Sequence, residues 1–284
     1  RTPAVLAGST ATVASLAPGR VMLGLGVGDT AVRLMGRRPA RVAELEAAVV
    51  QTRTLLSGAP LEVGAARPAR LRHANPAEVW VAAGGPRTLR MAGRVADGVF
   101  VRVGTHPGNI ATAIAEIRKG AEEAGRLYQE VKVALIFHTV VCDDPERAGL
   151  VARSMAAGYL EYSPMLLEQV GWSWQGPPLH TLQSRVWPDF HHASDLYAAG
   201  SLVDFLPDSV ADAFCVAGSW PEIRRRYVEL AAAYPEVTLM VPHPVPAWPP
   251  ASCTSPPLAP CSRNASSVIV RSRTSLPSIR SSPA

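Results

Sequence analysis

The chain has 284 residues, of which 48% are hydrophobic, and a formal net charge of +5. This length fits one large domain or two small ones, and the absence of any apolar run of about 18 residues argues against a membrane partner. Arg263, Arg271, Arg273 and Arg280 lie in a C-terminal stretch without acids, so the rest of the chain is close to neutral and we expect no nucleic-acid partner.

The four cysteines are scattered and form no C-x-x-C pair. Neither a zinc site nor a disulfide framework is therefore predicted. Scattered cysteines are typical of a reducing compartment, and together with the absence of a visible signal peptide they favour a cytoplasmic protein.

Helix and strand patterns alternate along the chain. Helices are predicted over 3–16, 39–56, 87–95, 110–125, 143–160 and 218–234. Five strands are predicted, over 21–28, 78–83, 99–103, 131–141 and 236–241. This alternation indicates an α/β fold built from β-α units. Because a (β/α)8 TIM barrel has eight strands and this chain begins with a helix, we predict a TIM-barrel-like fold that is truncated at its N-terminus.

Two segments do not fit the alternation. Residues 163–214 carry only partial helix patterns and a middle part that is rich in Trp, His and Pro. Residues 244–284 are rich in Pro and Ser and contain no Asp, Glu or Gly, so they are predicted to be a disordered tail of low complexity. The predicted organisation is a barrel domain over 1–243 followed by this tail.

Glycines occupy every second position at the end of the first predicted strand. Alternate strand residues point to one face, so Gly24, Gly26 and Gly28 leave that face bare, and Asp29 follows directly. A bare strand end beside an acid suits a flat ring, because glycine in a strand marks the close approach of a ligand or backbone. A tight barrel corner without a ligand is an equally good interpretation.

A second candidate site follows the strand predicted over 78–83. Two glycines stand between that strand and a helix, where free backbone N–H groups and the helix dipole attract anions. An ordinary tight turn is the alternative. The residues concerned are Ala82, Ala83, Gly84, Gly85, Arg87 and Thr88.

The histidines give weaker signals. His138 lies within an apolar strand pattern, where a satisfied structural histidine is the preferred interpretation and a residue that reaches substrate is the alternative. His191 and His192 with Asp195 match no standard ligand spacing, so no metal is predicted.

Asp97 and three tryptophans complete the candidates. Asp97 precedes Gly98 at a strand start and is interpreted as a structural acid of the turn. Trp172, Trp174 and Trp187 are interpreted as packing residues, with the lining of a pocket as the alternative.

Four segments together resemble a known family. They are 1–29, with its Gly-Arg…Gly-x-Gly-x-Gly-Asp pattern, 79–89, 92–99, with its Ala-Asp-Gly, and 120–126. In this order they resemble the luciferase-like monooxygenases, and most of all the deazaflavin (F420)-dependent branch that includes methylenetetrahydromethanopterin reductase-like proteins.

The resemblance implies a β/α barrel with F420, or alternatively FMN, at the carboxyl ends of the strands. It places the cofactor phosphate on the turn formed by Ala82, Ala83, Gly84 and Gly85, with Thr88 nearby. It places the flavin-type ring beside Gly26, Val27 and Gly28, with Asp29 on the substrate side as the candidate catalytic residue.

The function implied is hydride transfer between C5 of reduced F420 and a small organic substrate. An FMN-dependent monooxygenase is the first alternative. An inactive remnant is the second, because the family's first strands precede the segment that begins at Arg1, and an anion-binding module without turnover is the third. The family is often dimeric, which allows a homodimer here.

Overall fold

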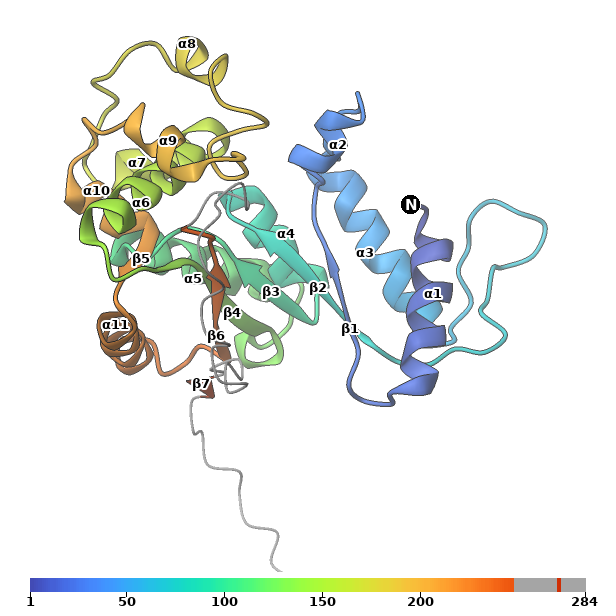
Figure 1. Ribbon diagram of the computed structural model, residues 1–284. Coiled ribbons are helices and arrows are strands. Elements are labelled where there is room, and N and C mark those ends of the chain that lie inside the picture. Colours follow the sequence, from blue (N-terminus) through green and yellow to red (C-terminus); the bar gives the residue numbers. More distant parts are fainter. Residues whose placement is uncertain (248–269, 272–284) are drawn as a thin grey trace, which may run out of the picture.

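Six parallel strands form one curved sheet, and a short seventh strand joins it in the antiparallel sense. The computed structural model describes residues 1–247 and 270–271 (Figure 1). The strands are β1 (Met22–Leu25), β2 (Glu78–Ala83), β3 (Gly98–Val101), β4 (Lys132–Val141), β5 (Cys215–Gly218), β6 (Leu239–Pro244) and β7 (Val270–Arg271).

The long strand β4 organises the sheet. Its first residues pair with β3 through the register Gly98↔Lys132, and its last residues pair with β5 through His138↔Cys215. Its opposite edge pairs with β6, so the strand order is β1-β2-β3-β4-β6-β7 with β5 beside the end of β4. One strand therefore holds three neighbours.

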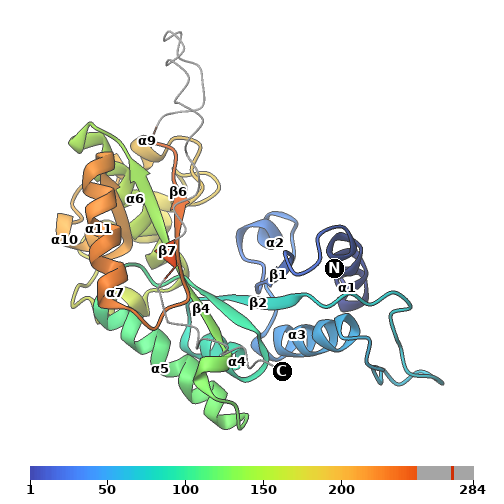
Figure 2. The same ribbon diagram turned by 90° about the horizontal axis from the view of Figure 1, so that it is seen from below.

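Helices connect the strands, as β-α units require. They are α1 (Pro3–Leu16), α2 (Thr30–Leu34), α3 (Val42–Leu56), α4 (Pro86–Val95), α5 (Pro107–Glu123), α6 (Pro145–Tyr162), α7 (Met165–Gln169), α8 (Leu179–Gln183), α9 (Leu196–Ser201), α10 (Asp208–Phe214) and α11 (Trp220–Ala233), with a 3-10 turn at Tyr128–Glu130. Figure 2 shows α1 and α3 at one end of the molecule and α6, α10 and α11 at the other.

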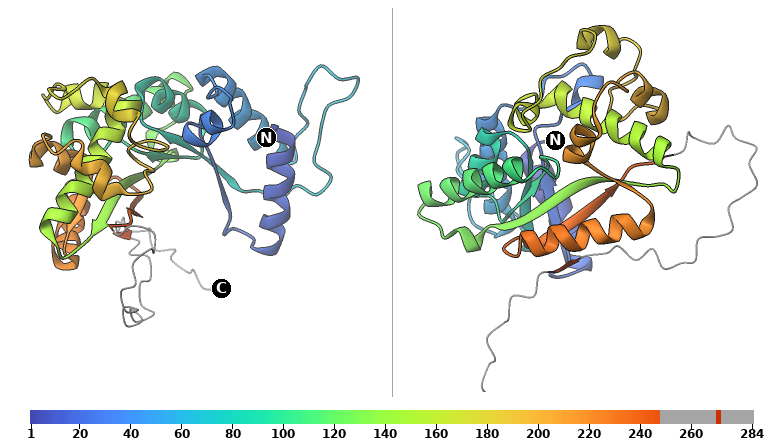
Figure 3. Two further views of the ribbon diagram at one scale, coloured as in Figure 1. Left: turned by 45° about the horizontal axis from the view of Figure 1, so that its top comes forward. Right: turned by 90° about the vertical axis from the view of Figure 1, so that its left-hand side faces the viewer.

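The outer face of the sheet is apolar and covered. Val79 and Val81 of β2 and Val99 and Val101 of β3 are almost completely buried, because helices α3 and α4 pack against these strands. Strands that are buried in this way read as nearly continuous apolar runs, which is why β2 and β3 were predictable. Figure 3 shows the sheet arching beneath these helices.

The opposite face, called the inner face below, carries residues of a different kind. Gly24, Trp80 and Gly98 lie side by side on adjacent strands. A side chain on Gly98 would collide with the Trp80 ring, so the glycine is what allows this ring to lie flat on β3. Trp80 in turn stacks on Phe100, with 4.8 Å between ring centroids.

The sequence-based prediction located most elements to within a few residues, but its strand count was wrong. The described residues form seven strands rather than five. β5 was missed because its four residues follow directly on α10, and α2 was missed because five residues give no helical period. The first strand ends at Leu25 rather than Gly28, because Gly28 adopts a φ of +76° and turns the chain into α2.

The predicted disordered tail lies mostly outside the described residues. Two residues of this tail form β7, which pairs with β6 at Leu239↔Arg271 and Met240↔Val270. β6 runs to Pro244, one residue past the predicted domain boundary, and Val245 and Ala247 are buried beside β4 and α6. The division into two domains stays a prediction.

Candidate active site

The glycine-rich end of β1 presents a bare surface. Gly24 and Gly26 are exposed on the inner face, as the alternation predicted. A Cβ placed on Gly26 would lie 3.6 Å from the Cβ of Ala82, so the end of β1 and the end of β2 lie side by side. Val27 is half-buried, and its carbonyl oxygen accepts from the Ala40 N–H at 2.9 Å. These contacts bring both predicted cofactor segments together.

The turn between β2 and α4 is open toward solvent. Ala83 is the last residue of β2, and Gly85 is the N-cap of α4. A Cβ on Gly84 would lie 2.7 Å from the carbonyl oxygen of Arg102, whereas a Cβ on Gly85 would meet nothing within 4 Å. Thr88 lies in the first turn of α4, whose N-cap has no side-chain hydrogen bond. The free N–H groups at this helix start are available to an anion.

Asp29 begins α2 and lies next to this surface. Its Oδ1 accepts from Nε of Arg33 at 2.6 Å, and both side chains are largely exposed. Arg33 lines a cavity of about 300 Å³ whose other lining residues come from α6, α8 and the following loop. Asp29 therefore reaches this cavity through Arg33 rather than lining it.

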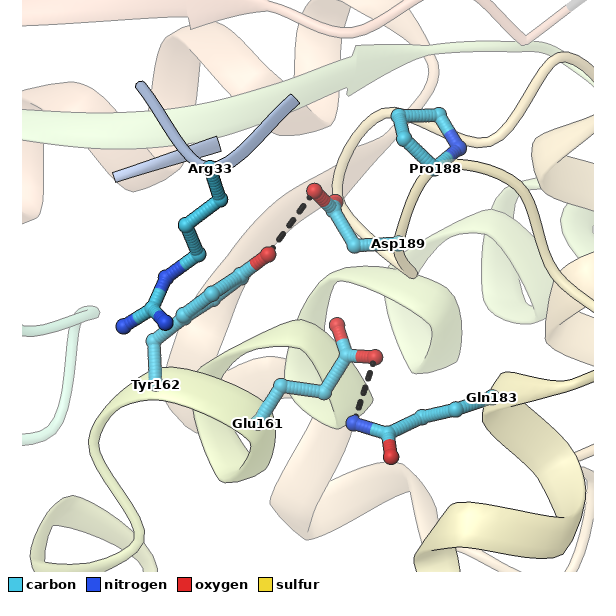
Figure 4. Close-up of a pocket in the computed structure, with 6 residues that line it drawn as sticks. All are labelled: Arg33, Glu161, Tyr162, Gln183, Pro188 and Asp189. Carbon is cyan, nitrogen blue, oxygen red and sulfur yellow. Dashed lines mark hydrogen bonds between the residues drawn. The ribbon is translucent and has the colours of Figure 1, made fainter. Parts of the chain in front are cut away.

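The cavity is built around one buried acid, Asp189, and one half-buried acid, Glu161. Asp189 is 3% exposed and accepts from the hydroxyl groups of Thr30 and Tyr162, both at 2.9 Å, and from the backbone N–H and ring of His192. Glu161 accepts from Gln183 and from the Phe190 N–H. Figure 4 shows the Tyr162 hydroxyl pointing to Asp189 and the Arg33 guanidinium turned away from it.

These contacts set the protonation of the cavity groups. Burial alone would raise the pKa of Asp189, but the hydrogen bonds from His192, Tyr162 and Thr30 outweigh it and hold that pKa below its usual value. The bond to Asp189 raises the pKa of His192 in return. Burial raises the pKa of Glu161. The cavity thus contains one firmly ionised acid and one acid that protonates more readily.

A cluster that the sequence analysis did not foresee lies at the carboxyl end of β3 and β4 on the inner face. Arg102 donates from its Nη2 to Nε2 of His138 at 2.7 Å, and His138 is 2% exposed. The ring of His138 lies 4.8 Å from that of His191 and 5.4 Å from that of His243, which is its direct neighbour on β6. We call Arg102, His138, His191 and His243 the Arg102 cluster.

The imidazoles of the Arg102 cluster are held neutral. Burial, reinforced by the nearby Arg102 charge, lowers the pKa of His191 to about 4 and lowers the pKa values of His138 and His243 as well. His138 was interpreted from the sequence as a satisfied structural histidine. The structure supports this interpretation only in part, because Nε2 bonds Arg102 whereas Nδ1 is buried without a hydrogen-bond partner among the described residues.

Two further acids that the sequence singled out, Asp97 and Asp195, hold the fold together by hydrogen bonds. Asp97 bonds the Val79 N–H at 2.8 Å and both Nε and Nη2 of Arg53, which ties α3 to the start of β3 and fits the structural interpretation. His192 bonds Asp189, whereas Asp195 caps α9, so these contacts hold the two residues in different surroundings.

The three tryptophans differ in how they pack. The rings of Trp172 and Trp174 lie 6.0 Å apart, and Trp174 packs edge-on to Phe205, as the packing interpretation predicted. Trp187 is 71% exposed, so packing was the wrong interpretation for this residue. It lies in the loop that carries Asp189.

Comparison with known proteins shows the family of this chain. The family model described as "Luciferase-like monooxygenase" matches residues 1–236. The chain belongs to the luciferase-like monooxygenase family. The family predicted from the four sequence segments is thereby confirmed.

Several relatives of this luciferase-like chain are F420-dependent enzymes. A 5,10-methylenetetrahydromethanopterin reductase of Methanolobus tindarius is 27% identical over 241 residues, which cover 81% of this chain and 70% of that protein. An F420-dependent glucose-6-phosphate dehydrogenase of Kribbella flavida is 33% identical over 160 residues, which cover 51% of this chain and 48% of that protein. The chain thus spans between about half and 70% of the length of these two relatives.

Solved structures agree on the fold. The F420-dependent tetrahydromethanopterin reductase from Methanopyrus kandleri superposes with a TM-score of 0.65 at 23% identity, covering 88% of this chain and 75% of that one. The predicted TIM-barrel-like α/β fold is confirmed, here as a curled sheet that remains open. None of the helices in the described residues is long and apolar enough to cross a membrane.

Proposed function

We propose that this protein is an F420-dependent oxidoreductase that moves a hydride between the deazaflavin and a small organic substrate. Family membership and the F420-dependent relatives support this proposal. The observation that carries it is the position of the glycine-bare end of β1 directly beside the glycine-opened start of α4. One surface can bind a ring and the other a phosphate at the same edge of the sheet.

The residues present fit the cofactor. Gly85 opens into space that a phosphate can fill, because a Cβ there would meet nothing within 4 Å, and the uncapped start of α4 offers N–H donors. Gly24 and Gly26 leave an exposed flat surface on the inner face for a ring. Bound F420 would supply the hydride-carrying carbon C5, and the chain would supply orientation and electrostatics.

In this proposal each segment has a separate task. The phosphate is bound by Gly84 and Gly85, which directly follow Ala82 and Ala83 at the end of β2. Thr88, in the first turn of α4, adds a further contact. The segment of Gly26, Val27 and Gly28, which directly follows β1, supports the ring from one side. Asp29, held by Arg33 at 2.6 Å, positions or protonates substrate.

Fluorescence titration tests the cofactor assignment. The purified chain is titrated with F420 and, separately, with FMN, and we expect preferential binding of F420. Gly85→Ala should weaken F420 binding about tenfold or more, since the new methyl group occupies the phosphate space without a clash. Gly8→Ala, where a Cβ also meets nothing within 4 Å, is the matched control and should bind as the wild type does. Preference for FMN would favour the monooxygenase, and binding of neither would favour the inactive remnant.

The role of Asp29 has its own test. Asp29→Asn keeps the size of the side chain and removes its charge, so we expect lower kcat with unchanged F420 affinity. An unchanged kcat would rule out the role. The homodimer and the cytoplasmic location stay predictions, and light scattering of the purified protein tests the first.

A further inference from the structure

Arg102 differs from three other partly buried arginines of the described chain, each of which has a carboxylate partner. Arg53 pairs with Asp97, Arg90 with Glu116 and Arg94 with Glu46, in each case within 3.0 Å. No carboxylate among residues 1–247 lies within ion-pair distance of Arg102, whose one side-chain hydrogen bond goes to His138. A half-buried cation is stable in a protein when an opposite charge accompanies it.

The histidines around Arg102 cannot supply that charge. Because Nε2 of His138 accepts the hydrogen bond from Arg102, the neutral ring must carry its proton on Nδ1. That Nδ1 has no acceptor among the described residues, and neither has the hydroxyl of Tyr159, whose ring lies 5.6 Å from the ring of His138. The cluster therefore holds one positive charge and buried polar atoms whose hydrogen bonds are unmet.

Both acids of the neighbouring cavity already have hydrogen-bond donors, and those of Glu161 are Gln183 and the Phe190 N–H. Asp189 accepts from Thr30, Tyr162 and His192, so its charge is compensated within its own network. Arg102 is thus the basic residue here that has no ion-pair partner among residues 1–247.

Position adds a further constraint. Arg102 directly follows β3, and its carbonyl oxygen lies against the Gly84 backbone of the proposed phosphate turn. Its guanidinium reaches His138 near the end of β4. The guanidinium therefore lies at the edge of the sheet where the proposed cofactor surface ends and substrate would approach.

We propose that the Arg102 cluster binds an oxyanion, a carboxylate or phosphate group of the substrate. The guanidinium presents a planar fork of donors that matches either group in two-point contact. The neutral imidazoles of His191 and His243 lie against the His138 ring and add no competing charge. The assignment to substrate rests on the proposed function, which gives the cofactor phosphate to Gly84 and Gly85.

Calorimetry of the cofactor-free protein tests the site itself. Wild type, Arg102→Gln and Arg225→Gln are titrated with inorganic phosphate and with acetate at constant ionic strength. We expect wild type to bind at least one probe and Arg102→Gln to bind it about tenfold more weakly or worse. Arg225→Gln is the matched control, because Arg225 is exposed and pairs with Glu229 on α11, and it should bind as wild type does. Equal binding by wild type and Arg102→Gln, or no binding of either probe by wild type, would overturn the proposal.

A second variant, Arg102→Lys, keeps the proposal testable if Arg102→Gln does not fold. Arg102→Lys keeps the charge but not the fork, so it should bind the probe more weakly than wild type and more tightly than Arg102→Gln. If Arg102→Gln loses its cooperative thermal transition, the comparison of Arg102→Lys with wild type decides, and equal affinity of the two proteins would contradict the two-point contact.

Repeating the titration with saturating F420 identifies the source of the oxyanion. Undiminished binding of the part of phosphate or acetate that Arg102→Gln loses, measured in the presence of F420, supports a substrate group. Competition with F420, together with weaker F420 binding by Arg102→Gln, assigns the cluster to the cofactor phosphate and overturns the substrate assignment. If the protein binds phosphate through Arg102 but binds no F420, the oxyanion site stands and the proposed function fails.

Discussion

The hydroxyl of Thr30 donates to Oδ2 of Asp189 over 2.9 Å and joins two segments that are 159 residues apart in the sequence. Thr30 opens α2 just after the glycine-rich end of β1, whereas Asp189 belongs to the long segment between α6 and β5. Tyr162, the last residue of α6, donates to the same oxygen. The position of α2 over the cavity therefore depends on one buried carboxylate.

Removal of this hydrogen bond should loosen the contact. Thr30→Val deletes the hydroxyl and keeps the shape of the side chain, so we expect a loss of about 1 kcal/mol in the free energy of unfolding. Urea denaturation measures it. Thr54→Val is the control, because the Thr54 hydroxyl makes a solvent-exposed bond to the Val50 carbonyl of its own helix α3. An equal loss in both variants would contradict a special role for the Thr30 contact.

The pair of His192 and Asp189 predicts a titration behaviour. Since the hydrogen bond to Asp189 raises the pKa of His192 in the folded state, this histidine contributes stability that is complete below pH about 6.5 and is lost as the pH rises through its folded pKa. Asp189→Asn should lower the pKa of His192, which NMR of the ring protons reads directly. An unchanged pKa would show that Asp189 does not set it.

His191 should act in the opposite direction. Its pKa is lowered to about 4 by burial and by Arg102, so the folded state resists its protonation. Its contribution is complete above pH about 6.5 and is lost as the pH falls from 6.5 toward 4. The stability of His191→Gln should fall less steeply over this range than that of wild type, measured by urea denaturation at several pH values. His73→Gln, at an exposed position, should follow the wild-type slope.

Gly98 should be intolerant of any side chain. A Cβ at this position collides with the Trp80 ring, so Gly98→Ala should cost about 1–3 kcal/mol through displaced packing on the inner face. Thermal and urea unfolding check this. Gly8→Ala, in an open position of α1, should be neutral or stabilising by up to about 1 kcal/mol. If Trp80→Leu does not recover part of the loss in the double variant, the collision is not its cause.

Local patterns made much of the fold predictable. The β2–α4 segment was located closely because its apolar run, two glycines and Pro86 specify a strand, a turn and a helix start within a short stretch. The bare surface of Gly24 and Gly26 followed from simple alternation. The family resemblance rested on these same local patterns.

The Arg102 cluster lay beyond such reasoning. His138, His191 and His243 are far apart in the sequence, and the parallel pairing of β4 with β6 and the path of residues 163–214 bring them together. The spacing of Asp189 and His192 matches no motif. A lone arginine after an apolar strand, as Arg102 follows β3, was the one local signal that could have pointed to the cluster.

The central position of β4 has a consequence for biosynthesis. One edge of this strand is completed only by β6, whose residues Leu239–Pro244 leave the ribosome long after β4 itself. Until then a ten-residue strand carries an unpaired edge, and such edges attract other chains. The growing polypeptide is therefore prone to aggregation until β6 has been made. We expect a nascent chain arrested before residue 239 to need chaperone protection to stay monomeric.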